Sequence, residues 1–83
     1  MTHVIRAEMV ASVHSVLVGV SEEIDVGATL VILESMKMEI PVLSEIRGWV
    51  MEVAVDVGDV VQEGDVIAVI SGGPRPVGGA STT

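Results

Sequence analysis

The 83-residue sequence has no cysteine, no phenylalanine and no tyrosine, and it contains a single lysine. Without cysteine, disulfides and thiolate-ligated metal sites are excluded, and nothing points to an oxidising compartment. The apolar runs reach only four or five residues, far short of the ~20 that cross a bilayer as a helix. The N-terminus lacks a basic stretch followed by an apolar run, which argues against a signal peptide. We therefore expect a soluble, cytoplasmic protein.

Basic residues are also scarce, because four bases stand against twelve acids and the net charge is −8. This charge opposes phosphate backbones and anionic lipid surfaces, so neither nucleic acid nor a membrane is an expected partner. The only histidines are His3 and His14, and His3 falls among the first few residues, which we expect to be loose. A metal site is therefore not predicted, and neither is a Ser-His-Asp arrangement.

What the chain has in quantity is valine and isoleucine, 25 residues together, and β-branched side chains favour strands over helices. Two sets of valines alternate with other residues: Val16, Val18 and Val20, and then Val53, Val55 and Val57. Period two is the signature of a strand, and no sustained helical stripe accompanies it. The predicted fold class is all-β.

The chain also carries an internal repeat. Residues 10–34 lie over residues 47–71 without a gap, at an offset of 37 (64 − 27). The identical pairs are Val13/Val50, Val16/Val53, Val18/Val55, Val20/Val57 and Gly27/Gly64. Gly27 and Gly64 suit turn positions that need a positive φ. Because one half cannot bury its apolar face alone, two halves packed face to face predict a flattened barrel-sandwich with approximate two-fold symmetry.

The composition changes near residue 72 to glycine, proline, serine and threonine without apolar periodicity. Such a composition is typical of a flexible tail. We therefore predict one domain over residues 1–71 and a tail over residues 72–83. Trp49 is expected to pack while staying partly exposed.

The segment between the halves contains the only lysine, Lys37. Apolar runs at residues 30–33 and 40–43 flank it and predict a hairpin that reverses at Met36 and Lys37. Pro41 lacks an amide donor, so the second strand is expected at a sheet edge or with interrupted pairing.

This predicted turn has two unfavourable features. Tight hairpin turns prefer Asn-Gly, Asp-Gly or Gly-X to Met-Lys, and a two-residue turn places Glu34 opposite Glu39, where like charges repel. Residues that disfavour the local conformation, with no gain in packing to offset them, are typical of functional sites. A lysine at a hairpin tip is nevertheless often a plain solvated charge, and methionine is often core filler. The residues alone leave these interpretations balanced.

The segment resembles the Glu-Ala/Ser-Met-Lys-Met motif of biotinyl domains, the biotin carboxyl carrier modules of biotin-dependent carboxylases. Its residues are Glu34, Ser35, Met36, Lys37, Met38 and Glu39. The resemblance covers residues 4–71 and is greatest to the small stand-alone biotin/lipoyl attachment proteins of bacteria. It implies two four-stranded antiparallel sheets, with the modified lysine exposed on the central hairpin.

By that resemblance, Lys37 carries covalent biotin, and Met36 and Met38 are recognition residues for biotin protein ligase and later for biotin carboxylase and carboxyltransferase subunits. The chain would be a monomeric carrier and ligase substrate, not an enzyme. No residue of the motif is expected to activate the amine, so by the same resemblance the activation comes from the ligase. Some acetyl-CoA carboxylase carriers have an extra loop in the first half, for which the ungapped repeat leaves no room.

Two alternatives stay open. A lipoyl carrier shares the fold and the hairpin lysine, but lipoyl domains usually have Asp-Lys-Ala at the tip, whereas this chain has Met36-Lys37-Met38. An unmodified binding or regulatory module could keep the barrel without the acceptor role. The sequence does not indicate which acceptor would be carboxylated.

Overall fold

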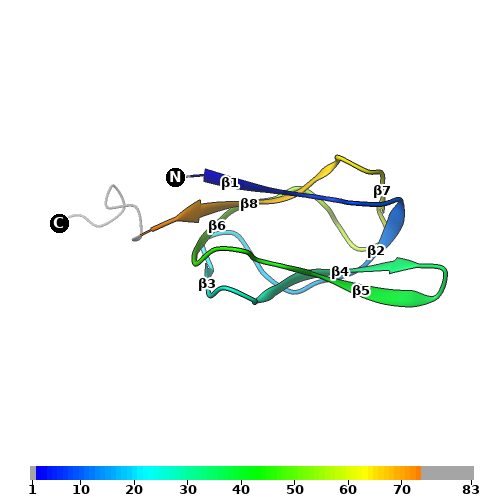
Figure 1. Cartoon of the computed structure of the whole chain (residues 1–83), viewed down its shortest axis with the longest axis horizontal. Helices are drawn as coiled ribbons and strands as arrows, with labels where there is room; N and C mark the ends of the chain where they lie inside the picture. The colour runs from blue at the N-terminus through cyan, green and yellow to red at the C-terminus, as the bar shows by residue number, and fades with distance from the viewer. Residues whose placement is uncertain (1, 74–83) are drawn as a thin grey trace.

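The computed structural model describes residues 2–73, which form eight strands and no helix. The strands are β1 (Thr2–Arg6), β2 (Ala11–Val16), β3 (Glu23–Ile24), β4 (Thr29–Ser35), β5 (Met38–Leu43), β6 (Gly48–Val53), β7 (Val60–Val61) and β8 (Val66–Gly72). They form two four-stranded antiparallel sheets, with strand orders β1-β8-β6-β3 and β5-β4-β2-β7 (Figure 1). The predicted all-β fold is confirmed.

The sequence repeat is also a structural repeat. At the offset of 37, β2, β3 and β4 coincide with β6, β7 and β8 residue for residue. The bulge between Val13 and Ser15 in β2 recurs between Val50 and Glu52 in β6. The halves do more than face each other, because β3 pairs with β6 and β7 pairs with β2. Each sheet therefore takes two strands from each half: β1 and β3 lie with β6 and β8, and β2 and β4 lie with β5 and β7.

The turns of the two halves match as well. Gly27 and Gly64 have φ values of 88° and 92°, which confirms the positive-φ turns predicted at these residues. Ser21, with φ of 76°, has Gly58, with φ of 95°, as its equivalent. The backbone conformation is thus repeated even where the residue type differs.

Carboxylates cap an equivalent turn in each half. The Gly19 N–H donates to Glu22 Oε1 at 3.0 Å, and the Asp56 N–H donates to Asp59 Oδ2 at 2.8 Å. These bonds give a physical reason for the acidic residue that both halves keep at this position. They satisfy backbone donors that no longer belong to a ladder.

The core consists of small branched side chains from both sheets. Its buried members are Ile5, Ala7, Ala11, Val13, Ile24, Leu30, Val31, Leu33, Val50, Val55, Val61, Ile67, Ala68 and Ile70. No aromatic ring is among them, and Trp49 is half-buried in β6. The thin barrel interior is therefore filled by aliphatic groups, as expected from the composition.

The alternating valines continue beyond the strands that they predicted. β2 ends at Val16 and β6 ends at Val53, whereas Val20 and Val57 are 61% and 66% exposed. The chain leaves the ladder at these points to enter the capped turns. The need for a turn therefore overrides the period-two pattern, although Val55 is buried as that pattern suggests.

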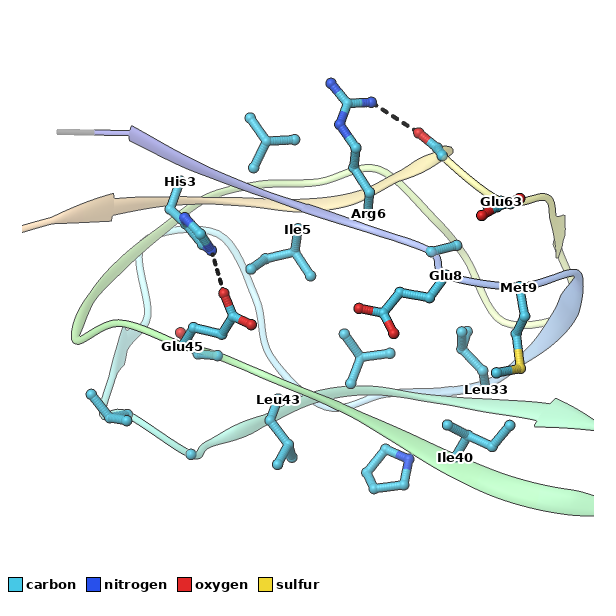
Figure 2. A pocket seen from close by; sticks show the side chains of 18 residues that line it. His3, Ile5, Arg6, Glu8, Met9, Leu33, Ile40, Leu43, Glu45 and Glu63 are labelled. Carbon is cyan, nitrogen blue, oxygen red and sulfur yellow. Dashed lines mark hydrogen bonds and ion pairs between the residues drawn. The ribbon is translucent and has the colours of Figure 1, made fainter.

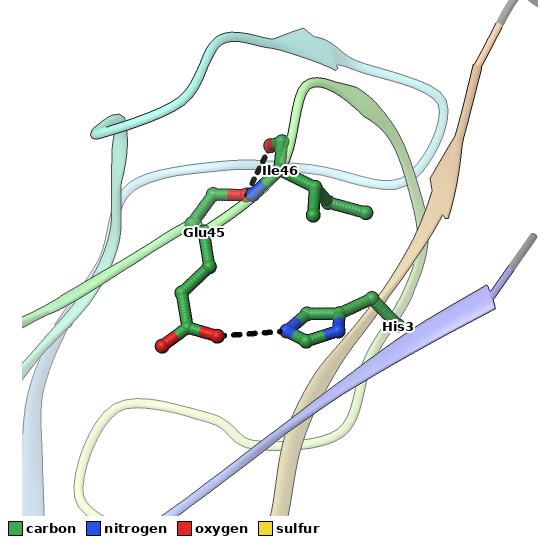
Figure 3. A network of polar contacts seen from close by, with 4 residues as sticks. His3, Glu45 and Ile46 are labelled. Atoms are coloured by element: carbon green, nitrogen blue, oxygen red, sulfur yellow. Dashed lines mark hydrogen bonds and ion pairs between the residues drawn. The ribbon is translucent and has the colours of Figure 1, made fainter.

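The expectation of a loose start to the chain is wrong from Thr2 onward. Residues Thr2–Arg6 form β1, which pairs with β8 and buries Ile5. His3 Nε2 lies 3.2 Å from Glu45 Oε1 (Figure 3). β1 is the equivalent of β5 at the offset of 37, but no residue of β1 is identical to its equivalent, so the sequence repeat does not reveal this strand.

The final strand, β8, runs to Gly72. Most of the predicted tail, residues 74–83, lies outside the described residues, so the division at residue 71 stays a prediction. Within the part of the chain that the structure describes, no helix is long and apolar enough to cross a membrane.

Candidate functional site

The β4–β5 hairpin reverses at Met36 and Lys37, as the flanking apolar runs predicted. Glu34 pairs with Glu39 and Ser35 pairs with Met38 across the two strands. β5 is the outer strand of its sheet, as the proline in it predicted. The turn lies at the end of the barrel away from the start of β1 (Figure 1).

The backbone of this turn adopts a left-handed conformation at both central residues. Met36 has φ of 52° and Lys37 has φ of 65°, the pattern of a type I′ turn, which favours Asn-Gly. The left-handed conformation costs an L side chain roughly 1–2 kcal/mol per residue. The equivalent of Met36 in the second half is Gly73, with φ of 87°. The hairpin thus keeps two long side chains where glycine would be easier.

The side chains of the tip point into solvent. Met36 is 91% exposed and Met38 is 64% exposed, so neither methionine fills the core. Lys37 is also exposed, and no hydrogen bond or ion pair holds it among residues 2–73. The hairpin therefore presents a primary amine between two soft apolar side chains, accessible to another protein.

A contact that the sequence did not predict connects the hairpin to β2. His14 Nε2 lies 3.6 Å from Glu39 Oε2, and His14 Nδ1 lies 2.8 Å from Ser15 Oγ. β4 separates β2 from β5 in the sheet, so the histidine reaches across a strand. His14 lies on the outer face of β2, and this position was a signal that its side chain could contact a neighbouring strand. The bulge between Val13 and Ser15 shifts the pairing of β2 with β4, however, so the residue that His14 reaches could not be identified from the sequence.

This chain of polar contacts does not form a hydrolase triad. The His14–Glu39 separation of 3.6 Å exceeds a normal hydrogen bond, and all three side chains are at least partly exposed. Groups of three or more histidine, aspartate or glutamate side chains able to hold a metal are also absent from the described residues. Among residues 2–73 the arrangement displays an amine to which no other side chain is joined by a hydrogen bond or an ion pair.

The biotin/lipoyl family model, described as biotin-requiring enzyme, matches residues 3–70. The biotinylated protein TB7.3 homolog of Mycobacterium leprae (strain TN) is 60% identical over 67 residues, which are 81% of this chain and 94% of the relative. The biotin/lipoyl attachment protein of Bacillus subtilis (strain 168) is 40% identical over 67 residues, with 81% and 92% covered.

A solved structure of a single-chain, multi-domain long-chain acyl-CoA carboxylase is similar over 89% of this chain, with a TM-score of 0.81 and 30% identity. The similarity covers only 7% of the carboxylase chain. The fold and the hairpin are therefore shared with one small part of a much larger protein.

Proposed function

The chain belongs to the biotin/lipoyl attachment family, and from that premise we propose that it is a biotin carrier with Lys37 as the attachment residue. The observation that carries the proposal is the exposed lysine at the tip of the two-residue turn, between two exposed methionines. We assign the surrounding recognition surface to Glu34, Ser35, Met36, Met38 and Glu39.

The chemistry required of Lys37 is amide formation. Its amine forms a bond to the carboxyl carbon of the cofactor, loses a proton, and the activating group leaves. Residues 2–73 place no hydrogen-bonding base on the lysine, so activation must come from a ligase. The chain therefore acts as a substrate and shuttle rather than as a catalyst.

When bound, biotin supplies the group that carries CO₂. The contribution of this chain is presentation, because a hairpin at the end of a packed barrel can enter another protein's active site while the barrel stays outside. A tether of this kind raises the effective concentration at successive sites. We accordingly propose biotin protein ligase, biotin carboxylase and carboxyltransferase as partners, supported by the similarity to a carboxylase domain.

A lipoyl carrier is the second candidate, because the family includes both cofactors and one relative is named a biotin/lipoyl attachment protein. The two methionines beside Lys37 favour biotin. Replacing Met36 by Asp and Met38 by Ala removes the soft apolar surface and adds a charge. This double variant should incorporate biotin more slowly, and an unchanged rate would show that the methionines do not instruct the ligase.

Intact mass spectrometry tests the proposal. The protein is co-expressed with a biotin ligase or with a lipoate ligase, beside Lys37→Arg, which keeps the charge but lacks a primary amine. We expect the mass increment of one biotin on the wild type and none on the variant. A lipoate increment, no increment, or an increment that persists in Lys37→Arg would each contradict the proposal.

A further inference from the structure

A groove of about 980 Å³ runs between β1 and β5 (Figure 2). Each is one of the two outer strands of its sheet, and the lining residues of one strand are equivalent to those of the other at the offset of 37. His3 faces the groove as the equivalent of Ile40, and Arg6 as the equivalent of Leu43. The groove therefore lies on the seam where the two halves meet.

Both strands that border the groove have one unpaired edge, because β1 pairs only with β8 and β5 pairs only with β4. Pro41 pairs with Ile32, and a proline fits there only with its nitrogen facing away from the ladder. The edge of β5 therefore lacks a donor at its centre. Proline is a common device for blocking an edge strand.

The edge of β1 has no such block. Val4 is the equivalent of Pro41 and pairs with Val69 in the same register. Just after β1, the Ala7 N–H donates to the backbone carbonyl oxygen of Asp65 at 2.8 Å, so this N–H points toward the chain that leads into β8. Because Val4 occupies the register position of Pro41, whose nitrogen faces away from the ladder, the Val4 N–H points away from β8 despite the register shift between Ile5 and Arg6. The β1 edge thus offers hydrogen bonds that β5 does not.

The groove lining combines apolar and acidic side chains. Leu33, Ile40 and Leu43 line one side, and Figure 2 shows Glu8 extending from the chain after β1 into the space between the strands. Glu8 and Glu63 have no ion-pair partner among residues 2–73. Arg6 also lines the groove, and its guanidinium donates to the Gly64 carbonyl oxygen at 2.9 Å without an ion pair among the described residues. Two carboxylates against one guanidinium leave the unpaired charge at the groove negative, on a chain whose net charge is already −8.

We propose that this groove binds an extended segment of a partner protein, which adds as a strand to the edge of β1 and alternates apolar with basic side chains. Strand addition uses the free backbone groups for affinity and the alternate side chains for specificity. Apolar side chains would contact Ile40 and Leu43, and basic ones would contact Glu8 and Glu63. A second copy of the chain is a poor occupant, because it brings another net charge of −8.

The test uses an acetylated and amidated hexapeptide of alternating valine and lysine, titrated to millimolar concentration into ¹⁵N-labelled protein. We expect chemical-shift changes centred on β1 and slower hydrogen exchange of the Val4 amide. The matching valine–glutamate peptide should cause neither. Shifts centred on the β4–β5 tip, equal binding of both peptides, or no binding at millimolar peptide would overturn the proposal.

The second half of the chain supplies a matched variant. Val4→Pro removes the same donor that Pro41 lacks, at an exposed position where the equivalent residue shows that the fold accepts proline. Binding should weaken by up to about tenfold, whereas Val4→Thr, which keeps the donor, should bind as the wild type does. Unchanged binding by a folded Val4→Pro would contradict strand addition.

Charge variants keep the proposal testable if Val4→Pro fails to fold. Glu8→Gln with Glu63→Gln should weaken binding of the valine–lysine peptide and flatten its salt dependence, because exposed charges are screened by salt. Binding that is indifferent to both changes would refute the acidic lining. Sedimentation should show a monomer at the same concentrations, and self-association through β1 would identify a second copy as the occupant instead. None of these outcomes depends on modification of Lys37.

Discussion

Among residues 2–73, the second half of the chain has glycine at each of its positive-φ positions, whereas the first half has glycine at only one of them. The equivalent pairs among residues 2–73 are Ser21/Gly58, Gly27/Gly64 and Met36/Gly73. Glycine reaches this conformation without the penalty that a Cβ brings. At these equivalent positions the second half uses the residue that adopts a positive φ most readily, and the first half departs from it at Ser21 and at Met36.

The departure at Met36 differs in kind from that at Ser21. Ser21 is a short polar residue in a turn between the sheets, whereas Met36 is a large apolar side chain that is 91% exposed. Lys37 follows it with a second positive φ of 65°. Strained backbone that persists without a packing gain is typical of functional sites. We interpret the tip as shaped for recognition, and the rest of the repeat as shaped for stability.

The largest effect on stability is expected at Gly48, where the second half has no room for the Cβ that the first half accommodates at the equivalent residue. Gly48 is the equivalent of Ala11, and a Cβ built on it would overlap the Ser71 carbonyl oxygen. Gly48→Ala should therefore destabilise the protein by about 3 kcal/mol, because backbone has to move. Urea unfolding measures this effect, and Ala11→Gly is the control, with an expected cost of about 1 kcal/mol. Wild-type stability in Gly48→Ala would mean that the halves are more alike than the structure indicates.

A core variant comes next. Val55 is buried, whereas its equivalent Val18 is only partly buried. Val55→Ala should cost about 2 kcal/mol in unfolding free energy and Val18→Ala clearly less, because the cost of deleting methyl groups rises with burial. Biotin incorporation at Lys37 should be unchanged in both folded variants. A slower incorporation in Val55→Ala would show that the barrel core influences the tip.

The repeat explains how much of this fold was predictable. Val13 and Val50 repeat in an ungapped register, and that register carries the strands, the bulges and the turn glycines with it. β1 was missed because none of its residues is identical to its equivalent in β5, although the offset of 37 carries β1 onto β5 as it carries β2 onto β6. The strand also depends on pairing with β8, some 60 residues away, which no local pattern around His3 encodes.

The site was predictable because its residues are adjacent in the sequence, whereas β1 depends on a partner strand far along the chain. The hairpin residues from Glu34 to Glu39 are consecutive, so the turn, the cross-strand glutamates and the exposed lysine follow from local pairing. The contact of His14 with Glu39 depends instead on the sheet order and on a bulge. Such contacts require the assembled sheet.

A smaller effect is expected at Ser21. Ser21→Gly removes a left-handed conformation from a residue with a Cβ, and it should stabilise the protein by about 1 kcal/mol. The gain is limited because glycine loses more backbone entropy on folding. Thermal or urea unfolding measures the change. Biotin incorporation should not respond, because this turn lies outside the hairpin; a loss of stability would show that Ser21 is not strained.

The smallest effects on stability are expected at the tip itself. Met38→Leu conserves apolar volume at a residue that is 64% exposed, and it should change the unfolding free energy by less than about 0.5 kcal/mol. Glu39→Gln should be neutral or slightly stabilising, because it relieves repulsion from Glu34. Ligation kinetics should slow in both variants. A destabilisation comparable to that of Val55→Ala would place these side chains in the core.

Met36→Gly tests most directly whether the tip is shaped for recognition at the expense of stability, because it installs the residue that the second half uses at the equivalent position. Unfolding free energy and the rate of biotin incorporation at Lys37 are measured on the same preparation, with Ser21→Gly alongside. We predict that both variants gain stability by about 1 kcal/mol and that only Met36→Gly is biotinylated more slowly. A Met36→Gly protein that loses stability, or that is biotinylated at the wild-type rate, would contradict this interpretation.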